Sequence, residues 1–231
     1  KDNAPDRAEW DESRGEEFQG LLDKGTFELL KEKPMDPPPI RTKEVRKLKK
    51  SMVGDPGRRK TRITADGSTQ EYGVNYTETF APSTQLSGFR LFLVLVTNLM
   101  LMVAHLDVTQ AFLNAHLKEK VNIEFPAGVL VQGCRYATLK RSIYGLKQAG
   151  HDWYKCVLQF IMTFDPRFKQ SNVDACLFYL VVEGTMLALL YIHVDDFLVG
   201  YASVTWYQVF LKQFMKTFKA TDQNGLSHAL G

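Results

Sequence analysis

The sequence lacks the features that define a disulfide framework, a zinc module or a membrane span. Its three cysteines, Cys134, Cys156 and Cys176, are odd in number and form no Cys-x-x-Cys pair, which predicts reduced thiols in a reducing compartment. The longest apolar stretch, residues 91–104, is shorter than the about 20 residues that cross a bilayer, so no membrane segment is expected. Neither a signal peptide nor an internal repeat is visible.

The composition that remains is that of a globular chain with a hydrophobic core. Hydrophobic residues make up 45% of the 231 residues, which is an ordinary share for such proteins. A chain of this length holds one large domain or two small ones. Because the sequence begins at Lys1 rather than at a methionine, we expect a fragment of a longer protein, which can include a targeting segment.

Charge is distributed unevenly, although the formal net charge is only +3. Residues 1–30 carry 4 basic and 9 acidic side chains, net −5, and residues 31–62 carry 12 and 4, net +8. The turn signal Gly54-Asp-Pro-Gly57 predicts a hairpin within the basic block. That block is a candidate polyanion contact, and a solvated basic loop is an equally good reading. Its cations include Arg46, Lys47, Lys49, Lys50, Arg58, Arg59, Lys60 and Arg62.

Helices are predicted where apolar residues recur every three to four positions. The predicted helices cover residues 6–24, 87–104, 109–117, 144–164 and 204–218. Gly25 is the expected stop of the first helix, and the second is expected to be buried. The apolar residues of the first are Trp10, Phe18, Leu21 and Leu22, and those of the last are Val209, Phe210, Phe214 and Phe218.

Strands are predicted where β-forming residues gather between turn signals. The predicted strands cover residues 26–30, 103–108, 121–125, 176–182 and 185–192. The last two form a hairpin around Glu183-Gly184, and the prolines of residues 34–39 require an extended loop. The mixture indicates an α+β fold, with helices on one face of a mostly antiparallel sheet.

Two adjacent carboxylates, Asp195 and Asp196, lie between two apolar stretches of strand length. This pattern predicts a hairpin with the carboxylate pair at its turn. Two close like charges are costly to keep ionised, and a divalent cation offsets that cost. A solvated turn is the alternative, because Asp is a common turn residue.

A third carboxylate, Asp107, ends the predicted strand 103–108. If that strand pairs with the hairpin, Asp107 faces Asp195 and Asp196. Three carboxylates on one rigid sheet can hold two Mg²⁺ ions, which prefer oxygen ligands. Two metals about 3.5–4 Å apart stabilise both the attacking and the leaving oxygen of a phosphoryl displacement. Taken alone, Asp107 is equally compatible with a strand-end cap.

The order of several longer motifs along nearly the whole chain is more specific than the aspartates. The motifs are Trp10 through Gly25-Thr-Phe-Glu-Leu29, Lys60-Thr-Arg62, Gln70-Glu-Tyr-Gly-Val-Asn-Tyr-Thr-Glu-Thr-Phe-Ala-Pro82, Leu106 to Asn114, Ser142-Ile-Tyr-Gly-Leu-Lys-Gln-Ala149 with Trp153-Tyr154, Val194-Asp-Asp196 and Leu226 to Gly231. Together they resemble the reverse transcriptase of copia-type (Pseudoviridae-like) LTR retrotransposons.

The resemblance implies the fingers and palm of a right-hand polymerase, with a mostly antiparallel palm sheet backed by helices. Residues 1–40 would be a lead-in helix and Pro-rich loop, residues 41–105 fingers-like and residues 106–231 palm-like, with the thumb, connection and RNase H domain absent. The implied activity is RNA-directed DNA polymerisation with Mg²⁺ or Mn²⁺. The implied partners are an RNA or DNA template–primer, deoxynucleoside triphosphates and the rest of a retrotransposon polyprotein. The implied location is cytoplasmic, in a virus-like particle, or nuclear.

The resemblance also assigns roles to single residues. Asp107, Asp195 and Asp196 would be the catalytic metal ligands. Phe112 would lie under the incoming sugar, where its ring would exclude a ribose 2′-hydroxyl, although a core Phe is the reading without the family. The triphosphate would meet Arg62 and Lys60, since the guanidinium fork suits phosphate. Tyr144 and Gly145 would line the nucleotide pocket, with Gly145 allowing close backbone approach. Separately from the resemblance, the basic block makes Arg58 and Arg59 candidate contacts for nucleic acid.

Some residues depart from the family pattern or have no role that the sequence supplies. His193 replaces a tyrosine before the catalytic turn and would contact primer backbone or lie within the sheet. Gly150 replaces a proline, Asp66 replaces a lysine, and Glu44 and Arg46 interrupt an apolar strand. Lys147 matches the family, yet a solvated lysine describes it equally well. The alternative function is therefore a decayed or domesticated copy that acts as a non-catalytic structural or RNA-binding protein.

Overall fold

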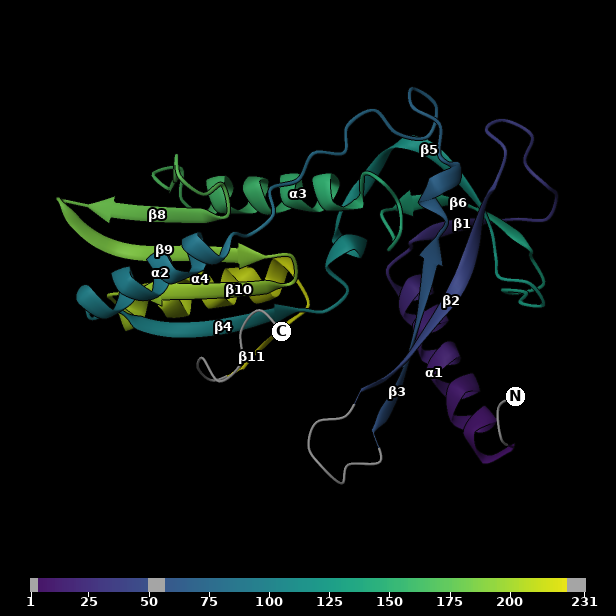
Figure 1. The fold of residues 1–231 in the computed structure, drawn as a ribbon, viewed down its shortest axis with the longest axis horizontal. Helices are drawn as coiled ribbons and strands as arrows, with labels where there is room; N and C mark the ends of the chain where they lie inside the picture. The colour runs from purple at the N-terminus through teal and green to yellow at the C-terminus, as the bar shows by residue number, and fades with distance from the viewer. Residues whose placement is uncertain (1–3, 50–56, 224–231) are drawn as a thin grey trace. The chain divides into compact units, whose positions relative to one another are not determined.

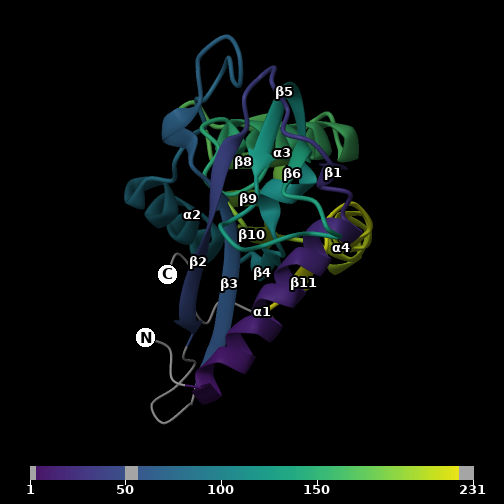
Figure 2. The ribbon, with the colours of Figure 1, turned by 90° about the vertical axis from the view of Figure 1, so that its right-hand side faces the viewer.

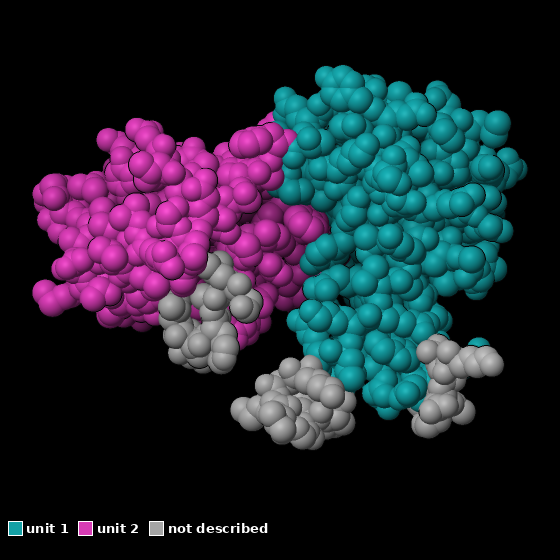
Figure 3. Space-filling model, in the orientation of Figure 1, with its two compact units in different colours: residues 1–79, 115–152 teal, residues 80–114, 153–231 magenta. Residues whose placement is uncertain are grey.

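The computed structural model describes residues 4–49 and 57–223. The predicted turn at residues 54–57 lies outside these residues except for Gly57, as do Lys50 and the motif at residues 226–231. The chain forms two compact units, which are coloured separately in Figure 3: unit 1 comprises residues 1–79 and 115–152, and unit 2 comprises residues 80–114 and 153–231. Each unit combines two separate stretches of chain. The assignment of fingers and palm to consecutive segments stays a prediction.

Unit 1 is built around a five-stranded sheet with the order β1-β6-β5-β2-β3. All neighbours are antiparallel except β2 and β5, which pair in parallel. Its elements are α1 (Ala4–Asp23), β1 (Phe27–Leu30), β2 (Ile40–Lys49), β3 (Arg58–Ala65), the 3₁₀ turn η1 (Gly67–Thr69), β5 (His116–Glu124) and β6 (Tyr136–Arg141). The expected basic hairpin is present as β2 and β3.

Helix α1 lies along β3, the edge strand of this sheet (Figure 2). Ser13 Oγ accepts a hydrogen bond of 2.8 Å from the amide of Thr61, and Glu17 Oε1 accepts one of 3.3 Å from the amide of Ile63. These side chains satisfy edge amides that would otherwise be open to another strand. Gly25, at φ +58, follows the helix as the sequence predicted.

Unit 2 is built around a six-stranded sheet with the order β11-β4-β10-β9-β8-β7, in which every neighbouring pair is antiparallel. Its elements are α2 (Leu86–Asn98), β4 (Met102–Val108), the 3₁₀ turn η2 (Ala111–Asn114), α3 (Ala149–Phe164), whose first residues belong to unit 1, β7 (Lys169–Gln170), β8 (Leu177–Val182), β9 (Thr185–His193), β10 (Asp196–Tyr201), α4 (Val204–Thr217) and β11 (Ala220–Asp222) (Figure 1). The α+β class is confirmed. Among the described residues, no helix is long and apolar enough to span a membrane.

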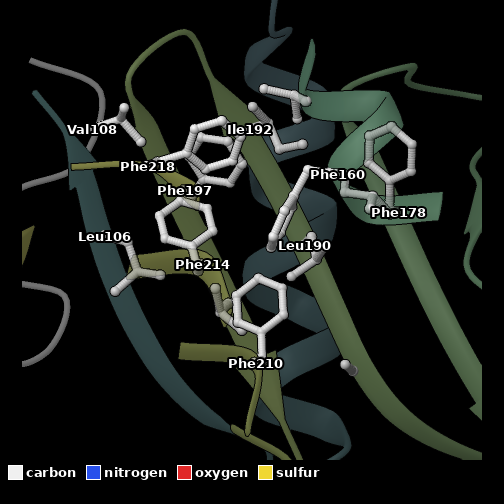
Figure 4. Close-up of a cluster of buried hydrophobic side chains, with 14 of the residues drawn as sticks. Leu106, Val108, Phe160, Phe178, Leu190, Ile192, Phe197, Phe210, Phe214 and Phe218 are labelled. Carbon is white, nitrogen blue, oxygen red and sulfur yellow. The ribbon is translucent and has the colours of Figure 1, made fainter. Parts of the chain in front are cut away.

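The larger core of unit 2 lies between one face of the sheet and helices α3 and α4 (Figure 4). Its aromatic members meet edge to face, as between Phe197 of β10 and Phe214 of α4, whose ring centroids are 4.9 Å apart. Such pairs add about 0.5–1.5 kcal/mol to the area they bury. The residues labelled in Figure 4 are Leu106, Val108, Phe160, Phe178, Leu190, Ile192, Phe197, Phe210, Phe214 and Phe218.

The expectation of helices on one face of the sheet is wrong, because α2 covers the opposite face. Phe92 and Val96 of α2 pack against Leu189, Tyr191 and neighbouring residues on this second face. Strands β8 to β10 are apolar on both faces, so each face requires a cover. Helix α2 itself is only half buried: Phe92 is fully enclosed, whereas Val94 is 54% exposed.

The predicted helix 87–104 ends early, at Asn98. Met100 adopts φ +50, and the amides of Met100 and Leu101 donate to the carbonyls of Thr97 and Val96. This is a Schellman ending, which usually carries glycine at the left-handed position. Because methionine occupies this position, no signal in the sequence showed that the helix ends here.

Three other helix predictions need correction. Residues 109–117 form only η2 before β5 begins at His116, because Gln110 adopts φ +53 and interrupts the helical path. The predicted helix 144–164 begins at Ala149, because Gly145 adopts φ +89. In α4 the side chain of Val209 is 58% exposed and does not belong to the apolar face.

Candidate active site

The register of three antiparallel strands positions the candidate catalytic carboxylates. Asp107 of β4 lies directly opposite Asp196, the first residue of β10. Asp196 also pairs with His193 of β9, so Val194 and Asp195 form the turn between β9 and β10. Leu106 and Phe197 point into the α3–α4 core. Because strand side chains alternate, Asp107 and Asp196 belong to the opposite face.

The turn that carries Asp195 is held by two hydrogen bonds to its carbonyls. The amide of Val108 donates to the Asp195 carbonyl at 2.8 Å, and Trp153 Nε1 donates to the Val194 carbonyl at 2.6 Å. Val194 adopts φ +53, a conformation that disfavours a β-branched residue. These contacts therefore fix a strained turn next to the carboxylates. The sequence identified Trp153 only as a helical aromatic that matches the family.

His105 is a site residue that the sequence interpretation missed. It is 5% exposed, and its Nε2 lies 2.7 Å from Asp196 Oδ1. It precedes Asp107 by two positions on β4, so both side chains are on the same face. That spacing was the available signal, although nothing in the sequence showed that Asp196 would be its partner. His193 contacts Thr84 through Nδ1.

The donor chemistry of the three aspartates fits a hard divalent cation. Carboxylate oxygens are the ligands that Mg²⁺ prefers, and β-ladder pairing gives Asp107 and Asp196 a fixed backbone spacing. Within the described part of the chain, no three or more His, Cys, Asp or Glu side chains are grouped closely enough to hold a metal ion. One oxygen of Asp196 is engaged by His105. The three aspartates thus supply the ligand type that Mg²⁺ prefers, but the described residues do not form a preformed metal site.

Phe112 lies in η2, between the buried residues Ala111 and Leu113. Its ring is partly buried and packs against the α3–α4 core. The packing agrees with the reading of Phe112 as a core residue, and its place beneath an incoming sugar stays a prediction.

Arg62 of β3 lies beside Tyr144 in unit 1, and Gly145 lies against the end of the same strand. Lys60 and Arg62 are both partly exposed and, two positions apart on the strand, belong to one face. The Arg62 guanidinium lies 5.0 Å from the ring centroid of Tyr144. The Tyr144 carbonyl accepts a 2.8 Å hydrogen bond from the amide of Ala65. These contacts bring two motifs that are far apart in the sequence into one cluster.

Gly145 allows the close backbone approach that the sequence predicted, and its neighbour is the end of β3. A Cβ at Gly145 would lie closer than 3.0 Å to the Ala65 carbonyl oxygen and 2.6 Å from Thr64 Cγ2. Its φ of +89 also favours glycine. In this structure glycine is required here by the docking of one protein segment on another.

Lys147, for which the sequence supplied no role, joins this cluster. Its amide donates to Gln70 Oε1 at 2.7 Å, its Nζ donates to the Gln70 carbonyl at 3.1 Å, and its ammonium lies 4.8 Å from the Tyr76 ring centroid. Gln70 Nε2 donates to Gln148 Oε1 at 2.9 Å. The motifs at residues 70–82 and 142–149 therefore form one hydrogen-bonded assembly, in which Lys147 is exposed and also contacts Gln70 and Tyr76.

The two arginines predicted to contact nucleic acid have acidic partners on α1. Arg59 forms ion pairs with both Asp6 and Glu9, and Arg58 Nη2 lies 3.0 Å from Glu16 Oε2. Their contact with template or primer stays a prediction.

The second face of the unit 2 sheet contains one buried carboxylate, Asp174, beside Cys176 and Tyr191. Asp174 is 6% exposed and accepts hydrogen bonds from the Cys176 amide at 2.8 Å and from the Tyr191 hydroxyl at 3.4 Å. Burial, together with the nearby Asp174 carboxylate, raises the pKa of Cys176 to about 12 and raises the pKa of Tyr191 as well. Both groups are therefore neutral at physiological pH.

The chain matches a known protein family over most of its length. Residues 24–231 match the family described as reverse transcriptase (RNA-dependent DNA polymerase), and the chain belongs to that family. The resemblance to the reverse transcriptase of copia-type LTR retrotransposons is confirmed.

Several individual proteins are similar in sequence to this chain. The chain is 32% identical over 84% of its length to the retrovirus-related Pol polyprotein from transposon TNT 1-94 of Nicotiana tabacum. It is 27% identical over 96% of its length to the corresponding polyprotein from transposon RE1 of Arabidopsis thaliana. A Ty1-ER2 Gag-Pol polyprotein of Saccharomyces cerevisiae is 31% identical over 53% of the chain. The chain spans 15% of each plant relative and 7% of the yeast one.

Proposed function

We propose that this chain is the fingers-and-palm part of an RNA-directed DNA polymerase within a retrotransposon polyprotein. The observation that carries the proposal is the register of Asp107 opposite Asp196, with Asp195 in the adjoining turn, in a chain of the reverse transcriptase family. In this proposal the antiparallel sheet of unit 2 with α3 and α4 is the palm, and the β2–β3 hairpin of unit 1 belongs to the fingers.

Asp107, Asp195 and Asp196 would hold Mg²⁺ or Mn²⁺. When bound, the cations would supply Lewis acidity and neutralise charge that develops on the reacting phosphate oxygens. The chain positions the three carboxylates: the β4–β10 ladder sets the spacing of two of them, and the Val108 amide and Trp153 indole hold the turn that carries the third. Such fixed geometry needs little reorganisation during reaction.

The substrates in this proposal are a template–primer of RNA or DNA and deoxynucleoside triphosphates. Lys60 and Arg62 would bind the triphosphate, and Tyr144 and Gly145 would border the nucleotide. Phe112 would lie against the sugar and exclude a ribose 2′-hydroxyl. The remainder of a polyprotein would be the covalent partner, since the relatives are named as Pol or Gag-Pol polyproteins. The proposed location is a cytoplasmic virus-like particle or the nucleus.

One observation favours the alternative of a non-catalytic, domesticated protein. His105 engages an oxygen of Asp196 that a metal-binding carboxylate would use. If this pairing persists with substrate present, the chain would retain nucleic acid binding without polymerisation.

RNA-templated primer extension distinguishes the two functions. We expect extension by the wild-type chain that requires Mg²⁺ or Mn²⁺, and loss of extension in Asp195→Asn with an unchanged circular dichroism spectrum. Glu183→Gln, in the exposed β8–β9 turn, is the charge-matched control and should extend normally. Undiminished extension by folded Asp195→Asn would refute the catalytic assignment. Template–primer binding without extension by the wild-type chain would support the alternative.

A further inference from the structure

The acidic and basic blocks of the sequence meet in unit 1. Helix α1 supplies acids from the net −5 block, and the β2–β3 hairpin supplies cations from the net +8 block. Figures 1 and 2 show α1 running alongside β3. Arg59 pairs with Asp6 and Glu9, and Arg58 pairs with Glu16. The helix therefore occupies cations that a polyanion would otherwise contact.

An aromatic ring accompanies these carboxylates. The guanidinium groups of Arg46 and Arg59 lie 5.5 and 5.9 Å from the ring centroid of Trp10 on α1. A nucleic acid strand offers arginine the same two kinds of contact, through anionic oxygens and flat rings. The first turns of α1 thus offer the hairpin arginines carboxylates and an aromatic ring, the same kinds of contact that a nucleic acid would offer.

The two halves of α1 are held by different interactions. The second half contains the buried residues Ser13, Glu17 and Leu21, and two of them accept hydrogen bonds from β3 amides. The contacts described for residues 6–12 are ion pairs on partly exposed acids and the Trp10 ring. Exposed ion pairs are weak and screened by salt, so this half can be displaced while the second half stays attached.

We propose that residues 6–12 of α1, together with the exposed carboxylate of Glu16, are an intramolecular competitor for nucleic acid on the β2–β3 hairpin. A template–primer backbone would gain Arg58 and Arg59 only when it displaces the acids of α1. The inference rests on the nucleic acid binding in the proposed function and is independent of catalysis by the three aspartates.

Charge neutralisation on α1 tests the competition. The test variant is Asp6→Asn/Glu9→Gln/Glu16→Gln. The control variant is Asp23→Asn/Glu32→Gln/Glu183→Gln, which removes the same charge at acids without a described ion pair. Affinity for a fluorescent RNA–DNA hybrid is measured by anisotropy across a KCl series.

The test variant should bind on the order of tenfold more tightly than the control at about 0.1 M salt. Its salt slope should be steeper by about 2, because two released arginines each contribute about 0.9. Equal affinities and slopes for the two variants would overturn the proposal. Absence of hybrid binding by every variant would also overturn it, whereas loss of primer extension alone would not.

Arg59→Gln provides an internal check by a double-mutant cycle. In the wild-type chain Arg59 is occupied by Asp6 and Glu9, so its replacement should change affinity less than about twofold. In the neutralised background Arg59 is released, and the same replacement should weaken binding about fivefold or more. Identical effects in the two backgrounds would contradict competition.

Gly15→Ala tests the same idea without weakening the fold. An added Cβ at Gly15 has nothing within 4 Å, and alanine favours the helix. A more stable α1 should be harder to displace and should weaken hybrid binding by up to about fivefold. Tighter binding by Gly15→Ala would count against the proposal, and circular dichroism verifies the helix in each variant.

Discussion

Gly145→Ala tests whether the Tyr-Gly-Leu-Lys-Gln segment is docked on β3 as described. Gly145 has φ +89, and a Cβ there would meet the Ala65 carbonyl oxygen and Thr64 Cγ2. A left-handed conformation costs an L-residue about 1–2 kcal/mol. Forcing an added methyl group against packed atoms costs about 1–3 kcal/mol more. We therefore expect a total destabilisation of about 2–5 kcal/mol.

Gly128→Ala is the matched control, because it separates conformational strain from the contact. Gly128 is also in unit 1 and has φ +78, but a Cβ there would have nothing within 4 Å. Its replacement should cost only the about 1–2 kcal/mol of backbone strain. The difference between the two variants therefore measures the packing of Gly145 against the end of β3.

Hydrogen exchange with mass spectrometry is the suitable assay, because a chain with two units need not unfold in one step. In Gly145→Ala, the amides of residues 58–65 should lose protection, whereas those of the β8–β9 hairpin should be unaffected. Equal loss of protection in the Gly145 and Gly128 variants would refute the docking argument.

Two further predictions concern titratable groups in unit 2. Burial beside Asp174 raises the pKa of Cys176 to about 12, so iodoacetamide at pH 8 should label the partly exposed Cys134 and Cys156 first. Peptide mapping would show the order, and preferential labelling of Cys176 would contradict its burial. Hydrogen bonds from Arg167 lower the pKa of Asp165 in the folded chain. The ionised carboxylate therefore stabilises the fold above its unfolded pKa of about 3.9. This stabilisation is lost as the pH falls through the lower folded pKa. Asp165→Asn should cost about 0.5–1 kcal/mol at pH 7 and less at pH 3 in thermal unfolding; a cost that does not change with pH would exclude the ion pair as its cause.

Local signals in the sequence were enough to predict several elements. Glu183-Gly184 between two β-rich stretches identified the β8–β9 hairpin, and its turn residues adopt φ +51 and +78. An apolar stretch ending in Asp107 identified β4. Strand β6 was missed, although Ala137 and Leu139 are both buried with the period of two that marks a strand.

What the sequence could not reveal depends on which distant segments pack together. His105 meets Asp196 across 91 positions, and Lys147 meets Gln70 across 77. No periodicity or turn signal encodes such pairs, because they follow from strand order and register. The stop of α2 at Met100 was hidden for a different reason, since a methionine occupies a left-handed position where glycine is usual.

The most direct test of the central claim is to locate the cation that Asp107, Asp195 and Asp196 would share. Fe²⁺ placed in a Mg²⁺ site generates, with ascorbate and peroxide, radicals that cut the backbone beside it. We predict cuts next to Asp107 and next to Asp195 and Asp196, which excess Mg²⁺ suppresses and Asp107→Asn removes. Cuts that lie elsewhere in the chain, or that persist in excess Mg²⁺, would contradict a shared metal site.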